Sequence, residues 1–114
     1  MDRTAAYVAD MVAAAWELAS MIDGVPLEAF VSDRLRCLAA EKLFINLGEA
    51  AKRIEPERAA AIPNVPWLRI IGLRNILAHG YEQVEHEVLY KTIQSDLPAV
   101  VIALETWLSA QPGP

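Results

Sequence analysis

The sequence is poor in the residue types that most catalytic sites use. Its 114 residues include one cysteine and two histidines, with no Cys-x-x-Cys pair, no His-Glu-x-x-His pair and no glycine-rich phosphate loop. The single cysteine, Cys37, can form neither an intrachain disulfide nor a thiolate metal cluster, which fits a reducing compartment. These absences disfavour most reaction classes.

A metal site is disfavoured as well. His79 and His86 could combine with Glu82 or Glu85, but an expected helix end separates the two histidines. We therefore expect no metal and no cofactor. His86 is interpreted as a polar residue at a helix start, and Cys37 as a small apolar residue on a packed helix.

No feature of the sequence divides the chain or directs it to a membrane. It has no Gly/Ser linker, low-complexity tract or long repeat, so we expect a single domain over residues 1–114. The N-terminus does not combine a basic stretch with an apolar one, and the longest apolar run, Leu97 to Leu104, is too short to cross a bilayer. These observations predict a cytoplasmic protein.

Composition points to a partner subunit and to an uneven charge. The hydrophobic fraction of 54% exceeds what a small monomer normally buries, which favours a homodimer. The net charge of −5 argues against general nucleic-acid coating. Within residues 52–74, however, the charge is +3, from Lys52, Arg53, Arg58, Arg69 and Arg74 against Glu55 and Glu57. One basic face on an acidic protein is therefore expected.

Apolar residues recur at steps of three and four along most of the chain, which predicts amphipathic helices. The expected helices run from Val8 to Ile22, from Ser32 or Asp33 to about Ile54, from Pro66 to near Gly80, and from His86 or Glu87 to Leu108. A short helix is expected within 57–61, and Pro98 should kink the last helix. No segment alternates as a strand would. The predicted fold is an all-α antiparallel bundle of four main helices plus short helical turns.

Several single residues have expected packing roles. Gly48 is expected to permit close helix packing. Trp16, Trp67 and Trp107 lie within apolar helical patterns, so we expect them in the core or at an interface.

The segment from Arg74 to Tyr81 gathers an arginine, an amide, an imidazole and a phenol around a helix end. The negative end of the helix dipole favours the charged form of His79, and Arg74 offers a bidentate phosphate donor. Positions five apart point about 140° from each other on an ideal helix, so Arg74 and His79 converge only if the helix end is distorted or Arg74 reaches across. On physical grounds alone a structural interpretation is favoured: His79 caps the helix, Arg74 pairs with Glu49 or another carboxylate, and Tyr81 packs at a loop.

At this segment the sequence resembles the HEPN superfamily, in particular the HepT-like toxins. Their pattern is R-x4-H-x-Y with a polar residue after the arginine, and Arg74, Asn75, His79 and Tyr81 match it. The similarity extends over most of the chain in the same order. Its blocks are 34–51 with Gly48-Glu49-Ala50-Ala51, Pro66-Trp67, Ile71-Gly72-Leu73-Arg74-Asn75 and Asp96-Leu97-Pro98.

The resemblance implies a dimerising helical bundle that places two Arg/His motifs around a shared cleft. It also implies metal-independent RNA cleavage, and a small nucleotidyltransferase antitoxin that attaches AMP to the motif tyrosine, Tyr81. On this basis the expected catalytic residues are Arg74, His79 and Asn75. The expected RNA contacts are Tyr81 and Arg69, the latter from the basic window.

RNA cleavage without a metal needs a base for the ribose 2′-hydroxyl, a cation for the phosphorane and an acid for the leaving oxygen. His79 would be the base or the acid, Arg74 would stabilise the phosphorane, and Asn75 would orient the phosphate or His79. A dimer would supply the second histidine. Two alternatives stay open: a non-catalytic module that binds a nucleotidyltransferase or a nucleotide, and a purely structural dimer. Glu49 is expected to be a solvated helix residue, with a role beside Arg74 as the alternative.

Overall fold

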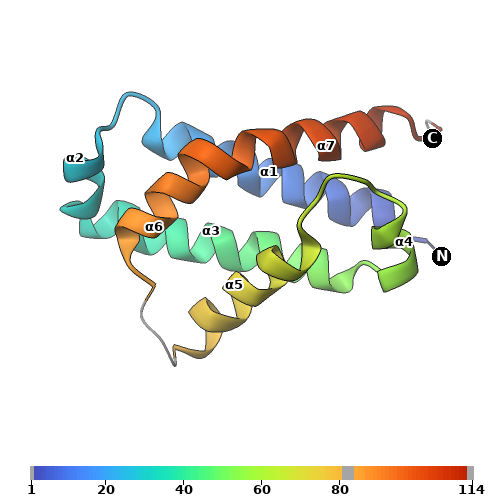
Figure 1. Cartoon of the computed structure of the whole chain (residues 1–114), viewed down its shortest axis with the longest axis horizontal. Coiled ribbons are helices and arrows are strands. Elements are labelled where there is room, and N and C mark those ends of the chain that lie inside the picture. Colours follow the sequence, from blue (N-terminus) through green and yellow to red (C-terminus); the bar gives the residue numbers. More distant parts are fainter. Residues whose placement is uncertain (1, 81–83, 113–114) are drawn as a thin grey trace.

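The computed structural model describes residues 2–80 and 84–112, and within these ranges the chain forms helices and no strand (Figure 1). In chain order the elements are α1 (Thr4–Ile22), α2 (Leu27–Val31), α3 (Arg34–Arg53), α4 (Pro56–Ala60), α5 (Trp67–His79), α6 (His86–Lys91), the π-helical turn η1 (Thr92–Asp96) and α7 (Leu97–Ser109). The all-α prediction is confirmed.

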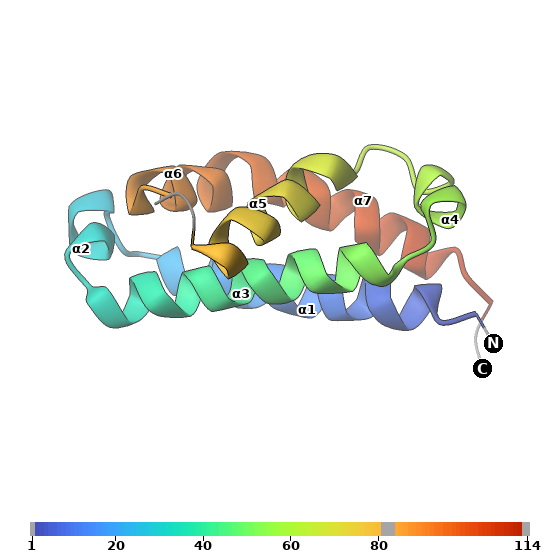
Figure 2. The ribbon, with the colours of Figure 1, turned by 90° about the horizontal axis from the view of Figure 1, so that it is seen from below.

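The four longer helices form an antiparallel bundle. Helices α1 and α3 run side by side along the length of the molecule, α7 packs against α1, and α5 packs against α3 (Figures 1 and 2). Successive long helices point in opposite directions, so α1 begins and α7 ends at the same end of the molecule (Figure 1). This arrangement leaves α5 at one side of the bundle, packed mainly on α3.

The core lies where α1, α3, α6 and α7 meet. Its fully buried side chains include Val8, Met11, Leu18, Phe30, Leu89 and Leu104. Helix α1 is long and apolar enough to cross a membrane by length and composition, but its apolar stripe packs in this core. Cys37 also lies in the core, where burial raises the pKa of its thiol, as expected for a structural cysteine.

Two helix ends follow the sequence signals. The Asp33 carboxylate accepts a hydrogen bond from the Arg36 backbone N–H at 3.1 Å, so Asp33 is the N-cap of α3. Gly80 closes α5 in the left-handed region with φ of 65°, and its N–H donates to the carbonyl of Ile76 at 3.1 Å. Both ends confirm the prediction, and the second fixes where the helix that carries His79 stops.

The last expected helix is interrupted one turn before Pro98. Helix α6 passes into η1, where the Leu97 N–H donates to the carbonyl of Thr92, five residues back. Proline has no N–H, and its ring cannot fit beside the carbonyl four residues earlier, so the preceding turn widens. The predicted distortion is therefore present, as a π-turn. The short helix α2 was not predicted, and α1 begins four residues earlier than expected, at Thr4.

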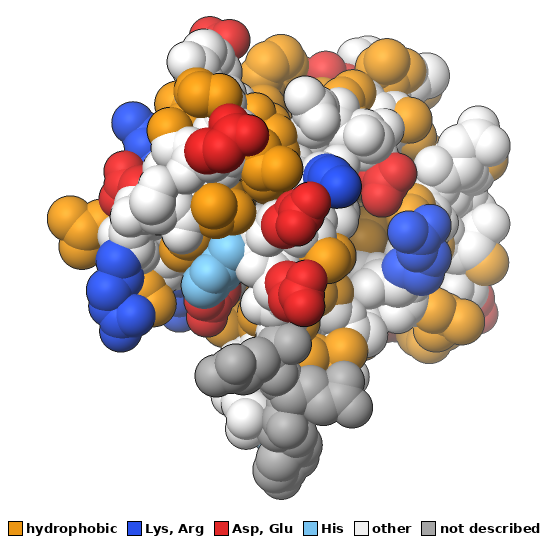
Figure 3. Space-filling model, turned by 60° about the vertical axis from the view of Figure 1, so that its left-hand side comes forward, with side chains coloured by type: hydrophobic (Ala, Val, Ile, Leu, Met, Phe, Trp, Pro, Cys, Tyr) orange, Lys and Arg blue, Asp and Glu red, His pale blue; other side chains and the backbone are white. Residues whose placement is uncertain are grey.

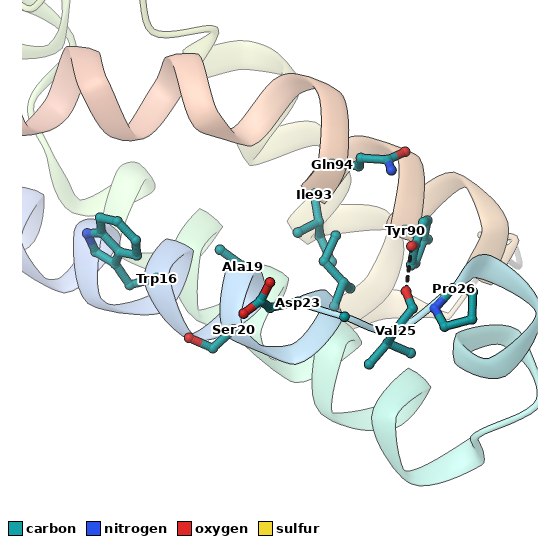
Figure 4. Close-up of a pocket in the computed structure, with 11 residues that line it drawn as sticks. Trp16, Ala19, Ser20, Asp23, Val25, Pro26, Tyr90, Ile93 and Gln94 are labelled. Carbon is teal, nitrogen blue, oxygen red and sulfur yellow. Dashed lines mark hydrogen bonds between the residues drawn. The ribbon is translucent and has the colours of Figure 1, made fainter.

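Not every apolar side chain is buried. Trp16 is 54% exposed, so of its two expected places the core is excluded and an interface stays a prediction. Its Nε1 donates to Glu105 Oε2 at 3.0 Å. It borders a cavity of about 740 Å³ that is also lined by Asp23 and Gln94, in which the Tyr90 hydroxyl donates to the Val25 carbonyl (Figure 4). None of Arg69, Arg74, Asn75 and His79 lines it.

The end of the molecule that carries α2 and α6 also shows hydrophobic side chains among charged ones (Figure 3). Val31, Leu35 and Val88 are exposed there. Part of the apolar excess in the composition therefore lies on the surface of the single chain.

Candidate functional site

Helix α5 carries Arg74, Asn75 and His79, and a glycine on α3 sets its distance from the bundle. A Cβ atom added to Gly48 would lie 2.2 Å from Arg74 Cβ and 3.1 Å from the carbonyl oxygen of Ile70. Any larger residue would push the two helices apart. The close-packing role predicted for Gly48 is confirmed, and its location is the contact with Arg74.

The Arg74 guanidinium is oriented by two side chains. Its Nη2 donates to Glu49 Oε1 at 3.1 Å, and its Nη1 donates to Asn75 Oδ1 at 2.8 Å. Its Nε is buried and has no hydrogen-bond partner within the part of the chain that the structure describes. The side chain is only 17% exposed, so the cation is fixed in position and its remaining Nη hydrogens are available to a phosphate.

Glu49 is the partner of Arg74 and is not simply a solvated helix residue, so the expectation for it is corrected. Its second oxygen, Oε2, lies 3.8 Å from Arg53 Nη2. The hydrogen bond from Arg74 lowers the pKa of Glu49 below its usual range. Glu49 therefore stays a carboxylate near neutral pH, where it can orient Arg74 but cannot supply a proton.

His79 is the last residue of α5 and is exposed, at the negative end of the helix dipole. The helix is continuous through His79, so a distorted helix end does not bring the two side chains together. Five positions on a regular helix place Arg74 and His79 about 140° apart. The structure thus brings Arg74, Asn75 and Glu49 together, with His79 at the end of the same helix.

Arg69 lies on another side of α5. It forms an ion pair with Asp96 of η1 at 3.7 Å and borders a groove of about 590 Å³ whose other lining is mostly apolar. Its role as an RNA contact stays a prediction. Tyr81 and Glu82 lie outside the described residues, so the AMP and RNA roles of Tyr81 also stay predictions.

His86 does more than begin α6. Its Nε2 lies 2.7 Å from Glu41 Oε2, which joins the start of α6 to α3. Among the described residues, no group of three or more histidine, cysteine, aspartate or glutamate side chains is arranged to hold a metal ion.

A family model for "Ribonuclease HepT-like" proteins matches residues 11–106, which include Arg74, Asn75 and His79. The chain belongs to the HepT-like family. This confirms the predicted similarity to HepT-like proteins, while pairing with an antitoxin stays a prediction. No solved structure gives a significant match to this HepT-like chain.

Curated relatives carry ribonuclease names. "Probable ribonuclease HepT" of Thermococcus cleftensis is 28% identical over 94 residues, which cover 82% of this chain and 86% of the relative. A protein of Methanocaldococcus jannaschii, provisionally named an RNase, is 27% identical over 95 residues, covering 83% and 87%. One of Caldanaerobacter subterraneus subsp. tengcongensis, similarly named, is 31% identical over 81 residues, covering 71% and 72%. These names support a ribonuclease-like function for the family member described here.

Proposed function

We propose that this protein is a metal-independent endoribonuclease that acts as a homodimer, with Arg74, His79 and Asn75 in its active site. The orientation of Arg74 is the observation that carries the proposal. A guanidinium held by Glu49 and Asn75, 17% exposed and one turn from an exposed histidine, suits a phosphate whose charge grows in the transition state. The ribonuclease names of the relatives support RNA cleavage as the class of reaction.

In the proposed reaction the ribose 2′-oxygen attacks the adjacent phosphorus. One His79 accepts the 2′-hydroxyl proton, and His79 of a second copy gives a proton to the departing 5′-oxygen. The 2′-O–P bond forms and the P–O5′ bond breaks, which leaves a 2′,3′-cyclic phosphate and a 5′-hydroxyl. Arg74 stabilises the phosphorane, and Asn75 keeps the guanidinium in place.

The surface of α5 supports a second copy at this site. The helix has no buried residue, Leu68 on it is 87% exposed, and Ile76 is 36% exposed beside the apolar groove. Packing α5 and this groove against another chain would cover the apolar side chains. It would also bring in the second imidazole that general acid–base catalysis requires.

Cleavage of RNA by the purified full chain in excess EDTA tests the proposal. We expect 2′,3′-cyclic phosphate ends, or the 3′-phosphate that follows their hydrolysis, and a loss of at least 100-fold for His79→Ala. Strict dependence on a divalent ion with 3′-hydroxyl products would overturn the mechanism.

Regulation is proposed to act through Tyr81 and a minimal nucleotidyltransferase antitoxin. Tyr81 directly follows the glycine that ends α5, two residues after His79. We propose that an AMP group on its phenol, with its phosphate charge and its purine, occupies the phosphate site at Arg74 and excludes RNA. Co-expression with the nucleotidyltransferase should add AMP masses to the wild-type chain and none to Tyr81→Phe, as measured by mass spectrometry.

A non-catalytic binding module is the second candidate. It is favoured by one observation, that α5 is a regular helix from Arg74 to His79, so the two side chains point about 140° apart and need not act on one phosphate. RNA binding preserved with cleavage lost in His79→Ala would favour the enzyme. Equal cleavage by wild type and His79→Ala would favour the module.

A further inference from the structure

Four arginines are connected, first by the Glu49 carboxylate and then by a shared polar cavity, from the proposed active site to the end of the molecule where α1 begins. We call Arg74, Arg53, Arg58 and Arg3 the arginine track. Its first step is the Glu49 carboxylate, whose two oxygens lie 3.1 Å from Arg74 Nη2 and 3.8 Å from Arg53 Nη2. Two guanidinium groups are thereby held next to each other on adjacent helices, α5 and α3 (Figure 2).

The track continues into a small polar cavity of about 360 Å³ between the end of α3, α4 and the start of α1. Its lining is Asp2, Arg3, Thr4, Tyr7, Arg53, Glu55 and Arg58. Arg58 Nη1 lies 2.7 Å from Asp2 Oδ2, which joins α4 to the N-terminal segment. The Arg3 guanidinium lies 5.8 Å above the centre of the Tyr7 ring, which holds it against α1.

The charges facing this line favour an anion. The four arginines are accompanied by three carboxylates, Asp2, Glu49 and Glu55, so the track is +1 in a chain of net charge −5. Hydrogen bonds from Thr4 lower the pKa of Asp2, so an incoming anion competes with a true carboxylate for Arg58. Ion pairs this exposed are weak, with the side chains of Arg58 and Asp2 about half exposed, so a phosphate can replace the carboxylate.

We propose that the arginine track binds successive backbone phosphates of one RNA strand that runs from the cleavage position at Arg74 into the Arg3–Arg58 cavity. A single line of guanidinium groups matches one sugar–phosphate backbone, and arginine is the residue best suited to bidentate phosphate contacts. The inference rests on the proposed function, because that function places the scissile phosphate at Arg74. It predicts that RNA longer than the few nucleotides around the cleavage position binds more tightly.

Fluorescence anisotropy with labelled single-stranded RNA tests the track on the full chain in the non-cleaving His79→Ala background. We compare Arg3→Ala/Arg58→Ala with Arg34→Ala/Lys91→Ala, a control that removes two positive charges far from the track. The control loses one ion pair, the Lys91–Glu87 contact at 3.0 Å, and the track variant loses two, Arg58–Asp2 at 2.7 Å and Arg58–Glu55 at 3.9 Å.

The track variant should bind a ten-nucleotide RNA about 10-fold more weakly, and its log–log salt slope should fall by about 1.4, since each phosphate contact on a single strand contributes about 0.7. It should also lose most of the affinity gained between a three- and a ten-nucleotide RNA, while the control keeps that gain. Arg3→Lys/Arg58→Lys, which retains the charges, should keep most of the salt slope, and circular dichroism checks that each variant folds.

If the track variant and the control weaken RNA binding equally, the inference is wrong. It is also wrong if the affinity of the wild-type chain does not rise with RNA length. Displacement of the RNA by an acidic peptide at lower concentration than by unlabelled RNA would assign the track to a protein partner and overturn it too. The proposed function can fail independently of this inference. If the track variant binds RNA more weakly but the wild-type chain does not cleave RNA, the ribonuclease proposal is rejected and the RNA-binding role of the arginine track stands.

Discussion

Arg74 is oriented by a carboxylate 25 positions earlier in the chain, so the chemistry of the site depends on a contact between two helices. Glu49 holds Nη2, and Asn75 holds Nη1, at 3.1 and 2.8 Å. Two acceptors, Glu49 Oε1 and Asn75 Oδ1, limit the rotation of the guanidinium plane. A phosphorane placed against it would meet hydrogen-bond donors already in position, which is how fixed dipoles lower a barrier.

Glu49→Gln tests this orientation. The amide keeps the shape but removes the charge, so we expect cleavage to fall about 10-fold, mainly in kcat, because a charge-assisted hydrogen bond to Arg74 is lost. Single-turnover cleavage and RNA affinity, measured side by side, check this. Glu57→Gln, the same change on α4, should have no effect. A fall in affinity with kcat unchanged would contradict a positioning role.

The ion pair between Glu49 and Arg74 also predicts how the free energy of unfolding depends on pH. The pKa of Glu49 is lowered in the folded state from its ordinary 4.5, so the folded protein holds this carboxylate ionised more strongly than the unfolded chain does. The wild-type advantage over Glu49→Gln is therefore complete above pH 4.5 and is lost as the pH falls through the lowered folded value. Urea denaturation midpoints of both proteins across this range measure it. A difference that grows on acidification would contradict the assignment.

At the scale of elements, the crossing of α3 and α5 decides where Arg74 lies. The crossing is close because Gly48 has no side chain at the point where the Arg74 Cβ and Cγ atoms approach. Gly72 stands on α5 itself, but a Cβ atom there would meet nothing within 4 Å. Alanine at Gly48 therefore tests packing, and alanine at Gly72 is the control that changes helix propensity alone.

Gly48→Ala should destabilise the fold by about 1–2 kcal/mol, since overpacking at the crossing outweighs the gain in helix propensity. Gly72→Ala should stabilise it by about 0.5–1 kcal/mol, because only the propensity changes. Urea denaturation at one protein concentration measures both. Cleavage should fall in Gly48→Ala, since Arg74 is displaced. Stabilisation by both substitutions would show that the helices adjust freely.

At the scale of the whole molecule, the single chain leaves α5 uncovered on the sides away from α3. In the proposed dimer that helix meets a second copy, so the dimer and the active site share one surface. Leu68→Glu on α5 should convert the dimer to a monomer and abolish cleavage, because a carboxylate would be buried at the interface. Leu35→Glu is the control, since Leu35 is 81% exposed at the start of α3. Light scattering measures the oligomeric state of both variants, and cleavage assays measure their activity. A fully active monomer would reject the shared cleft.

The sequence by itself determined the helices, their order and the residues of the motif. Apolar residues at spacings of three and four predicted the long helices. Asp33 predicted the start of α3, Gly80 the end of α5, and Pro98 the distortion before α7. These signals could be read from the sequence because they act between neighbours in the chain. The match of Arg74, Asn75 and His79 to the HepT-like pattern can likewise be seen in the sequence alone. The sequence predicted that Gly48 permits close helix packing, but not that the residue it packs against is Arg74.

Only the tertiary structure decided what surrounds the motif. Glu49 meets Arg74, and His86 meets Glu41, across 25 and 45 positions, and no local periodicity encodes such distances. Trp16 was expected in the core or at an interface because its neighbours are apolar, yet it is 54% exposed and its Nε1 donates to Glu105 of α7, 89 positions away. The arginine track has the same origin, since Arg3 and Arg58 come together only when α1 and α4 meet at one end of the bundle. Helix packing, which joins residues distant in sequence, set the partners of Arg74 and His86 and paired Arg58 with Asp2.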